Sequence, residues 1–281
     1  MKDIIISNQK EFEEKKRKIA EGGAKNLHIV SDFDGTLTKA FVNGRKIPSV
    51  ISILRDENYL TPDYPAKAHA LFDKYHPIEI DPNISSAEKK KAMQEWWTKH
   101  FQLLIDSKLN RKDIEKAVQS ENIQLREGAE ELLKNLKERN IPLVILSSSG
   151  LGADSISMHL KNRNLLFANI HIISNAFIWD GAGNAIGVKE PIIHSLNKSE
   201  ASIKNYPAFE TIKNRKNVIL LGDGVGDTQM ISGFEAENAI KIGFLNYDPE
   251  KNLDRFKEAF DAILTGNRSM DFVNDLLLNP V

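Results

Sequence analysis

The chain has 281 residues, of which 41% are hydrophobic and 27% are charged, so it can bury a sizeable core as one large domain or as a core with a smaller domain. Lysine and arginine number 38 and aspartate and glutamate 39, and the net charge of -1 gives no overall field that favours nucleic acid polymers or an anionic membrane. There is no cysteine, which excludes disulfides, thiolate metal sites and cysteine nucleophiles, and no apolar segment approaches the roughly 18 residues of a membrane span. We expect a cytoplasmic protein without membrane or nucleic acid partners, and its oligomeric state has no signature in the sequence.

The first predicted strand is an apolar run that begins at Leu27 and leads into SDFDGTLT, residues 31–38. Asp32 and Asp34 thus stand one residue apart at the end of a buried strand. Two carboxylates this close raise each other's pKa unless a cation lies between them, so the pair indicates a metal site. The alternative is an ordinary Asp-Gly turn, in which Asp34 only starts a loop.

Residues 41–124 have few strand signals and long helical periodicity. The segment SSAEKKKAMQEWWTKHFQLLIDSKL opens with a capping-box pattern, Ser85 with Glu88, and continues with apolar residues at helical spacing. A helical block is therefore predicted directly after the first strand, where it would cover the carboxyl end of that strand.

From Gly128 onward, strand-like and helix-like patterns alternate. The apolar runs are IPLVILS, NIHIIS, NVILLGDG, AIKIGF and AILTG, and segments of helical length such as ADSISMHLKNRN separate them. Short apolar runs bounded by Gly, Asn and Asp indicate parallel strands that are buried on both faces. The predicted class is α/β, with the helical block inserted into it.

Polar residues follow several of these runs, and ligands bind outside the carboxyl ends of the strands in open parallel sheets. Besides the first pair of aspartates, the candidates are Ser147, Ser148, Ser149, Lys198, Asp223 and Asp227. Magnesium binds a few carboxylate oxygens together with waters and phosphate oxygens, while a serine and exposed amides hold an anion. The set therefore suits a magnesium ion and a phosphate group that share one site.

Four of these stretches, DFDGTLT, the serine after IPLVIL, the lysine of LNKSE, and GDGVGD, resemble in order the four motifs of the haloacid dehalogenase superfamily of phosphohydrolases. VNGRKIP, YHPIEIDP, EWWTKH, LREGAEELLKNLKERNIP, LLGDGVGDTQM and IKIGFLN are similar to the cytosolic pyrimidine 5'-nucleotidase (type III cytosolic 5'-nucleotidase) family, from about Leu27 to about Asn246. The resemblance implies a Rossmann-like parallel core of residues 1–40 and 125–281 with a helical cap of residues 41–124. It also implies magnesium-dependent hydrolysis of nucleoside 5'-monophosphates through an aspartyl-phosphate.

The resemblance also assigns catalytic roles. Asp32 would be the nucleophile that attacks phosphorus, and Asp34 would protonate the leaving oxygen and then activate water. The metal ligands would be the carboxylates of Asp32 and Asp223 and the backbone carbonyl of Asp34. Lys198 would hold Asp32 and the phosphate, although by itself it reads as a solvated surface lysine.

The same family places a phosphate-binding hydroxyl after the second core strand. Its eukaryotic members have a shorter SAG where this chain has SSSG, so alignment from the strand selects Ser147 and alignment from the glycine selects Ser148. We favour Ser147 because the sheet fixes strand length, with the amides of Ser148 and Ser149 nearby; the alternative is a hydroxyl that bonds its own loop. Asp227 would orient waters or the adjacent loop, and a helix N-cap role is compatible with that.

The helical block is expected to select the substrate. On a helical wheel Trp97 lies on the apolar stripe and is predicted to be a core residue, whereas Trp96 lies on the flank beside Glu95. The family recognises the base with a Glu-Trp pair at this place, so Trp96 would stack on the base and Glu95 would accept hydrogen bonds from it. The alternative is that Trp96 packs and Glu95 is solvated.

Two other functions fit the same motifs. One is a phosphatase for another small phosphomonoester, such as a sugar phosphate or phosphoserine, because the core fixes the chemistry and not the leaving group. The other is a non-catalytic protein that binds a phosphate ligand, although Asp32 and Asp223 are both present.

Overall fold

The computed structural model describes residues 4–47, 49–57, 59–81, 83–198, 203–232 and 236–278. A seven-stranded sheet forms its centre, in the order β1 (Ile4–Ile6), β11 (Ala262–Thr265), β10 (Asn238–Leu245), β9 (Asn217–Gly222), β2 (Leu27–Ser31), β5 (Leu143–Leu146) and β6 (Ile170–Ile173). Neighbouring strands are parallel except at the edge, where β1 is antiparallel to β11. The predicted parallel α/β sheet is confirmed.

The central strand β2 pairs with β5 on one side and β9 on the other, and every residue of these three strands is buried. The chain runs from β2 to β5 and β6, then returns to β9 and continues to β10 and β11. The order reverses at β2, so the crevice for a ligand lies at the carboxyl ends of β2, β5 and β9.

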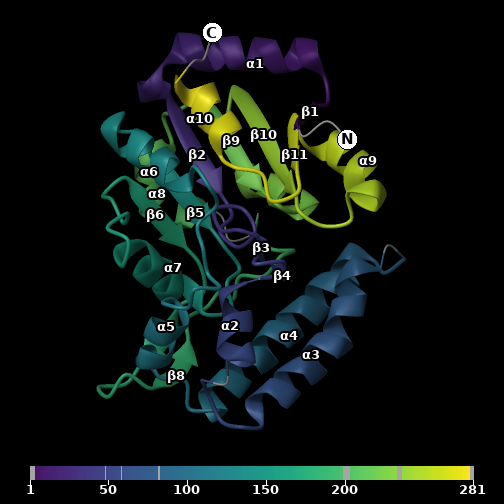
Figure 1. Cartoon of the computed structure of the whole chain (residues 1–281), viewed down its shortest axis with the longest axis vertical. Helices are drawn as coiled ribbons and strands as arrows, with labels where there is room; N and C mark the ends of the chain where they lie inside the picture. The colour runs from purple at the N-terminus through teal and green to yellow at the C-terminus, as the bar shows by residue number, and fades with distance from the viewer. Residues whose placement is uncertain are drawn as a thin grey trace.

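Helices cover both faces of the sheet (Figure 1). Adjacent strand residues point to opposite faces, so Ile29 and Val30 belong to different apolar cores. The core around Ile29 includes residues of α1 (Gln9–Gly22), α6 (Ala129–Glu138), α7 (Gly152–Lys161) and α10 (Asp271–Leu278). The core around Val30 includes residues of α8 (Ala208–Ile212), α9 (Pro249–Ala259) and the 3-10 helix η3 (Val225–Ile231). Two more 3-10 helices, η1 (Ala24–Asn26) and η2 (Ile203–Asn205), lie in connections.

The predicted helical block forms α2 (Val50–Asp56), α3 (Tyr64–Ile80), α4 (Ser86–Asp106) and α5 (Arg111–Ala117). Figure 1 shows these helices grouped beyond one end of the sheet. The predicted capping box of α4 is present, because Ser85 accepts from the amide of Glu88 and the Glu88 side chain accepts from the amide of Ser85. None of the helices among the described residues is both long and apolar enough to cross a bilayer.

One short strand and two short hairpins are not predicted from the sequence pattern. They are the edge strand β1, the hairpin of β3 (Phe41–Val42) with β4 (Arg45–Lys46), and the hairpin of β7 (Phe177–Trp179) with β8 (Ala185–Val188). The last hairpin packs against the helical block, where the amide of Ala185 donates to the carbonyl of Leu109 at 2.9 Å and that of Arg111 to Gly183 at 2.9 Å. The division of the chain into a helical cap of residues 41–124 and a core of the remaining residues stays a prediction. That division places the β7–β8 hairpin in the core, although the hairpin packs against the helical block.

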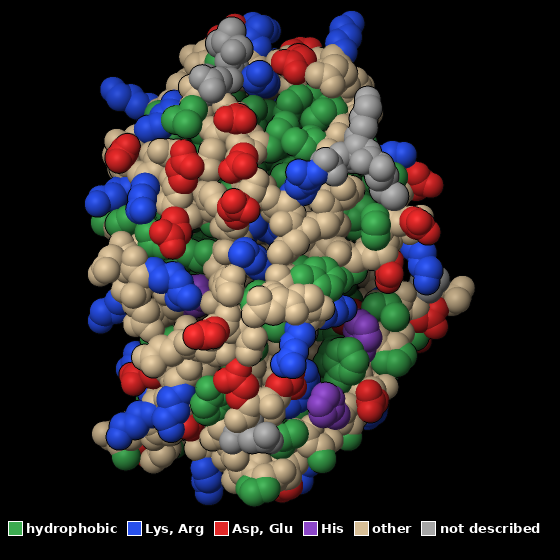
Figure 2. Space-filling model, in the orientation of Figure 1, with side chains coloured by type: hydrophobic (Ala, Val, Ile, Leu, Met, Phe, Trp, Pro, Cys, Tyr) green, Lys and Arg blue, Asp and Glu red, His purple; other side chains and the backbone are tan. Residues whose placement is uncertain are grey.

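Acidic and basic side chains are interspersed over the face of the molecule in Figure 2. This mixture agrees with the net charge of -1. An anionic ligand must therefore be held by local groups.

Candidate active site

A cavity of about 860 Å³ lies between the carboxyl ends of the core strands and the helical block. Every predicted catalytic, metal-binding and phosphate-binding residue lines it: Asp32, Asp34, Ser147, Ser148, Ser149, Lys198, Asp223 and Asp227. The helical block supplies the facing wall, which includes Ile51, Glu79, Ile80, Lys89 and Trp97. Segments far apart in the sequence thus meet in one place, as the strand order requires.

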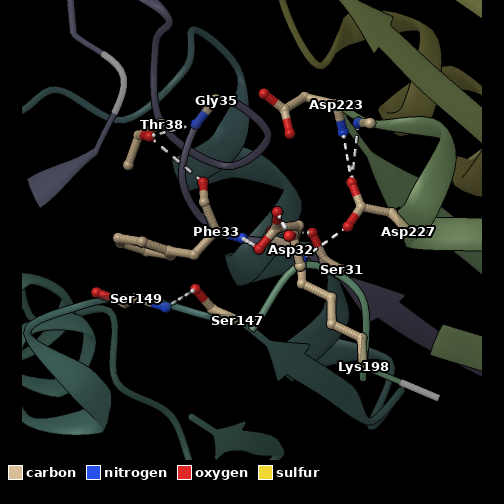
Figure 3. Close-up of polar contacts among 12 residues, drawn as sticks. Ser31, Asp32, Phe33, Gly35, Thr38, Ser147, Ser149, Lys198, Asp223 and Asp227 are labelled. Carbon is tan, nitrogen blue, oxygen red and sulfur yellow. Dashed lines mark hydrogen bonds and ion pairs between the residues drawn. The ribbon is translucent and has the colours of Figure 1, made fainter. Parts of the chain in front are cut away.

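Asp32 forms an ion pair with a buried lysine. Lys198 Nζ lies 2.9 Å from Asp32 Oδ2, and Lys198 is only 4% exposed, so it is not a solvated surface residue. The other oxygen of Asp32 accepts a hydrogen bond from the amide of Phe33 at 2.7 Å. Burial raises the pKa of Asp32 to about 6, against the opposing charge of Lys198. In Figure 3 Asp32 lies at the centre of the group, between Asp223 and the Ser147–Ser149 loop.

Asp227 connects this lysine to the end of β9. Lys198 Nζ donates to Asp227 Oδ1 at 2.7 Å, and Asp227 Oδ2 accepts from the amides of Asp223 at 3.1 Å and Gly224 at 2.9 Å (Figure 3). Burial lowers the pKa of Lys198, but the charges of Asp227 and Asp32 outweigh it and raise the pKa above its usual range. Asp227 therefore fixes both the lysine and the loop of Asp223, and it also satisfies amides at the start of η3.

The carboxyl group of Asp34 is held by the helical block. The amide of Val50, the first residue of α2, donates to Asp34 Oδ1 at 3.2 Å. Burial, followed by the charge of Asp32, raises the pKa of Asp34 to about 7. A carboxyl group with this pKa holds and releases a proton near neutral pH, which suits a general acid and base.

The carboxylates fit a divalent cation. Oxygens of Asp32, Asp223 and Asp227 lie within 4.8 Å of one another, and burial, followed by the charges of Asp227 and Asp32, raises the pKa of Asp223 well above its usual range. Four carboxyl groups gather at the carboxyl ends of the core strands, those of Asp32, Asp34, Asp223 and Asp227, and the buried cations beside them include Lys198 and Arg126. A divalent ion bound there would offset the repulsion among these carboxylates.

The serine loop follows β5. Ser147 Oγ accepts a hydrogen bond from the amide of Ser149 at 3.1 Å, so the predicted alternative, a hydroxyl that bonds its own loop, is present here. The hydroxyl proton of Ser147 can still be donated to a phosphate oxygen. Ser147 is buried and Ser148 is half-buried, but both line the cavity, so the preference for Ser147 stays a prediction.

Comparison with known proteins identifies the family. The pyrimidine 5'-nucleotidase (UMPH-1) family pattern matches residues 35–279. The chain is 36% identical over 262 residues to a 7-methylguanosine phosphate-specific 5'-nucleotidase of Gallus gallus, covering 93% of this chain and 90% of that protein. This chain belongs to the pyrimidine 5'-nucleotidase family. It is a phosphoric monoester hydrolase, which confirms the resemblance and leaves the non-catalytic alternative without support.

Solved structures agree with this nucleotidase in fold. The crystal structure of cytosolic 5'-nucleotidase IIIB bound to cytidine superposes with a TM-score of 0.87 at 30% identity, covering 99% of this chain and 93% of that one. A substrate-bound phosphoserine phosphatase has a TM-score of 0.55 at 19% identity, covering 90% and 98%. The second likeness concerns the fold alone, and both agree with the predicted haloacid dehalogenase-like core.

The predicted base-binding pair of the nucleotidase does not reach the cavity. Among the described residues that line it, Trp97 is present and Glu95 and Trp96 are not. Glu95 Oε1 pairs with Lys99 Nζ at 2.5 Å, and Trp96 stacks between the rings of Tyr75 and Trp97. Trp97 is half-buried, so it packs against the core as predicted but also forms part of the wall. Base recognition by Glu95 and Trp96 stays a prediction, and it would need a rearrangement of α4.

Sequence reasoning also missed residues that connect the parts of the site. Glu79 of α3 accepts from Ser195 Oγ at 2.6 Å and so joins the helical block to the loop that leads to Lys198. Burial raises the pKa of Glu79, but hydrogen bonds from His76 and Ser195 together outweigh it and lower the pKa below its usual range. Arg126 and Asn246 lie beside Asp223, and the only signal for Asn246 is its place directly after the buried strand β10.

Proposed function

We propose that this nucleotidase hydrolyses nucleoside 5'-monophosphates to a nucleoside and phosphate, with magnesium and through an aspartyl-phosphate on Asp32. The observation that carries the proposal is the ion pair of Lys198 Nζ with Asp32 Oδ2, 2.9 Å apart, at a cavity that Asp34 and the serine loop also line. The family's name and the cytidine in the related structure support a nucleotide as substrate. Because that relative is named a cytosolic enzyme, we also propose the cytoplasm as its site of action.

In the first step an oxygen of Asp32 attacks phosphorus, and the bond between phosphorus and the ribose 5'-oxygen breaks. Asp34 donates its proton to the leaving oxygen, which its pKa of about 7 permits near neutral pH. Lys198 stabilises the negative charge on the phosphoryl oxygens, and the hydroxyl of Ser147 with the amide of Ser148 holds one of them, while the amide of Ser149 donates to Ser147 Oγ.

In the second step Asp34, now ionised, takes a proton from a water molecule. The water oxygen attacks phosphorus, the bond between phosphorus and Asp32 breaks, and phosphate leaves with the aspartate restored. A magnesium ion supplies charge neutralisation that lets an anionic nucleophile approach an anionic phosphoryl group. Asp32, Asp223 and the backbone carbonyl of Asp34 would hold it, with Asp227 orienting the loop.

We propose that the bases accepted include cytosine and 7-methylguanine, because relatives are named for 7-methylguanosine phosphate or contain cytidine. A 7-methylated guanine carries a positive charge, which favours an aromatic face and a nearby carboxylate. Trp97 and the ionised Glu79 provide both on the cavity wall. Sugar phosphates and phosphoserine offer no aromatic ring to stack there.

The test is phosphate release from a panel of phosphomonoesters with magnesium and with excess chelator. The panel contains cytidine, uridine, adenosine and 7-methylguanosine 5'-monophosphates, a sugar phosphate and phosphoserine, with Asp32→Asn as the blank. We expect release from the cytidine and 7-methylguanosine phosphates with magnesium only. A preference for the sugar phosphate or phosphoserine would reject the substrate class, and full activity in chelator would reject the metal.

A further inference from the structure

Arg126 is a buried cation that binds backbone oxygens rather than a carboxylate. The residue is 1% exposed, and its Nε donates to the carbonyl of Thr36 at 2.8 Å, Nη1 to that of Arg268 at 2.7 Å, and Nη2 to that of Gly35. The guanidinium also lies over the ring of Phe244, 4.4 Å from its centroid. Within the described part of the chain no carboxylate forms an ion pair with it.

Two of the three carbonyls that Arg126 binds follow directly after Asp34. Gly35 and Thr36 continue the backbone from the carbonyl that would be a metal ligand, so their orientation determines where that carbonyl points. Gly35 has a φ of +71°, and a Cβ there would lie 2.3 Å from Asp223 Oδ2. The two segments that carry predicted metal ligands therefore touch at Gly35 and Asp223.

Asn246 completes the connection to Asp223. Arg126 Nη2 donates to Asn246 Oδ1 at 3.1 Å, which orients the amide so that its Nδ2 donates to the carbonyl of Gly35 at 2.9 Å and to Asp223 Oδ2 at 3.4 Å. The guanidinium of Arg126 thus holds the loop after β2 directly, and it holds Asp223, which follows β9, through the side chain of Asn246. A planar group with donors in several directions can do this, whereas a lysine offers one point of attachment.

We propose that Arg126 is a positioning residue that sets the affinity of the site for its divalent cation, by fixing the loop after Asp34 and, through Asn246, the carboxylate of Asp223. The inference rests on the proposed metal-dependent function and adds a residue to it. Groups that orient metal ligands commonly change metal affinity by about 10- to 100-fold when they are replaced.

A substitution that keeps the positive charge of Arg126 separates a positioning role from a purely electrostatic effect on metal binding. A positive charge near the site repels a divalent cation, so an arginine that acted only through its charge would weaken metal binding and its loss would tighten it. Arg126→Lys keeps the charge and removes the fork of donors. If the residue acts by positioning, this substitution weakens metal binding although the charge is unchanged.

Arg215 is the matched control. Its guanidinium also binds backbone carbonyls, with Nη1 donating to Ala24 and Leu27 at 2.8 Å each and Nη2 to Asn140 at 3.3 Å. Leu27 is the first residue of β2, so these contacts lie at the end of the strand opposite the site. Arg215→Lys therefore removes the same kind of contact where no metal ligand is near.

The experiment is calorimetric titration of magnesium into substrate-free wild type, Arg126→Lys, Arg215→Lys and Asn246→Ala, with melting curves of each in chelator. We expect the Kd for magnesium to rise about 10-fold or more in Arg126→Lys and Asn246→Ala. Arg215→Lys is expected to melt at a lower temperature and keep the wild-type Kd. Should Arg126→Lys not fold, Asn246→Ala decides, because it leaves the carbonyl contacts of Arg126 in place.

An unchanged or lower Kd in both site variants would overturn the inference while leaving the proposed function intact. Failure of the wild type to bind magnesium would instead contradict the proposed function and the inference together. Parallel losses in Arg126→Lys and Arg215→Lys would mean that the effect is general loosening of the fold and not positioning.

Discussion

At Asp32 the chain buries a carboxylate beside one lysine, and the resulting pKa of about 6 leaves it largely ionised at neutral pH, as the proposed role of nucleophile requires. Asp34, two residues on, has a pKa of about 7, so it keeps its proton to a higher pH than Asp32 does. Environments that separate two neighbouring pKa values are what an acid–nucleophile pair requires.

Asp32→Asn tests the proposed role of Asp32 as the nucleophile. The amide is nearly the same shape but is a poor nucleophile, and Lys198 keeps its contact with Asp227, so the protein should remain folded. We expect nucleotide turnover to fall by at least about 10⁴-fold, measured as phosphate release, with an unchanged circular dichroism spectrum. Near-normal phosphate release from the folded variant would reject Asp32.

At the scale of elements, α4 offers two adjacent tryptophans of which one lines the cavity. We expect Trp97→Ala to lower kcat/KM for the nucleotide by about 5- to 150-fold, because base stacking contributes about 1–3 kcal/mol, with little change on an aryl phosphate. Trp96→Ala should lower the melting temperature and affect both substrates alike. Selective loss of nucleotide activity in Trp96→Ala instead would support the prediction from the sequence and require α4 to move on binding.

The same helix carries a buried histidine. Burial, followed by the charge of Arg55, lowers the pKa of His100 to about 4, so the unfolded chain takes up a proton near pH 6.5 and the folded chain does not. The unfolded state therefore binds more protons between these values, and stability is lost as the pH falls from about 6.5 to about 4. His28 and His159, whose pKa values are lowered to about 4 and about 3, act in the same direction.

His100→Phe should make the helical block less sensitive to acid. Phenylalanine keeps the edge contacts with Tyr64 and Trp97 and cannot be protonated. Between about pH 7 and about pH 5 the unfolding free energy of the variant should fall by about 2 kcal/mol less than that of the wild type, measured by urea denaturation. Parallel curves for His100→Phe and wild type would contradict this account.

For the whole molecule, the cluster of carboxyl groups at the site predicts that magnesium stabilises the fold. Binding to the folded state alone adds about 2.7 kcal/mol at 100 times the Kd, so the wild-type melting temperature should rise with magnesium. Asp223→Asn should lose most of that rise, and it should melt higher than wild type in chelator because one of the clustered charges is gone. The exposed Asp254→Asn of α9 should behave like wild type. A magnesium response that Asp223→Asn retains in full would remove Asp223 from the metal site.

The core strands and the residues at their carboxyl ends could be predicted from the sequence. Buried parallel strands appear as apolar runs, and the polar residues that follow these runs all lie at the same edge of the sheet. The residues lost to sequence reasoning share a physical cause. The helical wheel correctly predicts that Trp97 packs against the core, but it describes one helix and not what faces it, so it misses the place of Trp97 and Glu79 on the cavity wall. The guanidinium contacts of Arg126 join positions about 90 to 142 residues apart, which no local pattern encodes. The isoleucines of β1 and the β7–β8 hairpin are too short to give a periodic signal.

The central claim is a covalent phosphoryl group on Asp32, and Asp34→Asn with an aryl phosphate tests it most directly. The aryl leaving group needs no proton, so the first step can proceed, while the second step lacks its base and stalls. The account predicts a burst of about one aryl alcohol per active site, and peptide mass spectrometry after acid quenching should find one phosphoryl group on the peptide that contains Asp32. No burst, together with no phosphoryl group on that peptide while phosphate is still released, would contradict it.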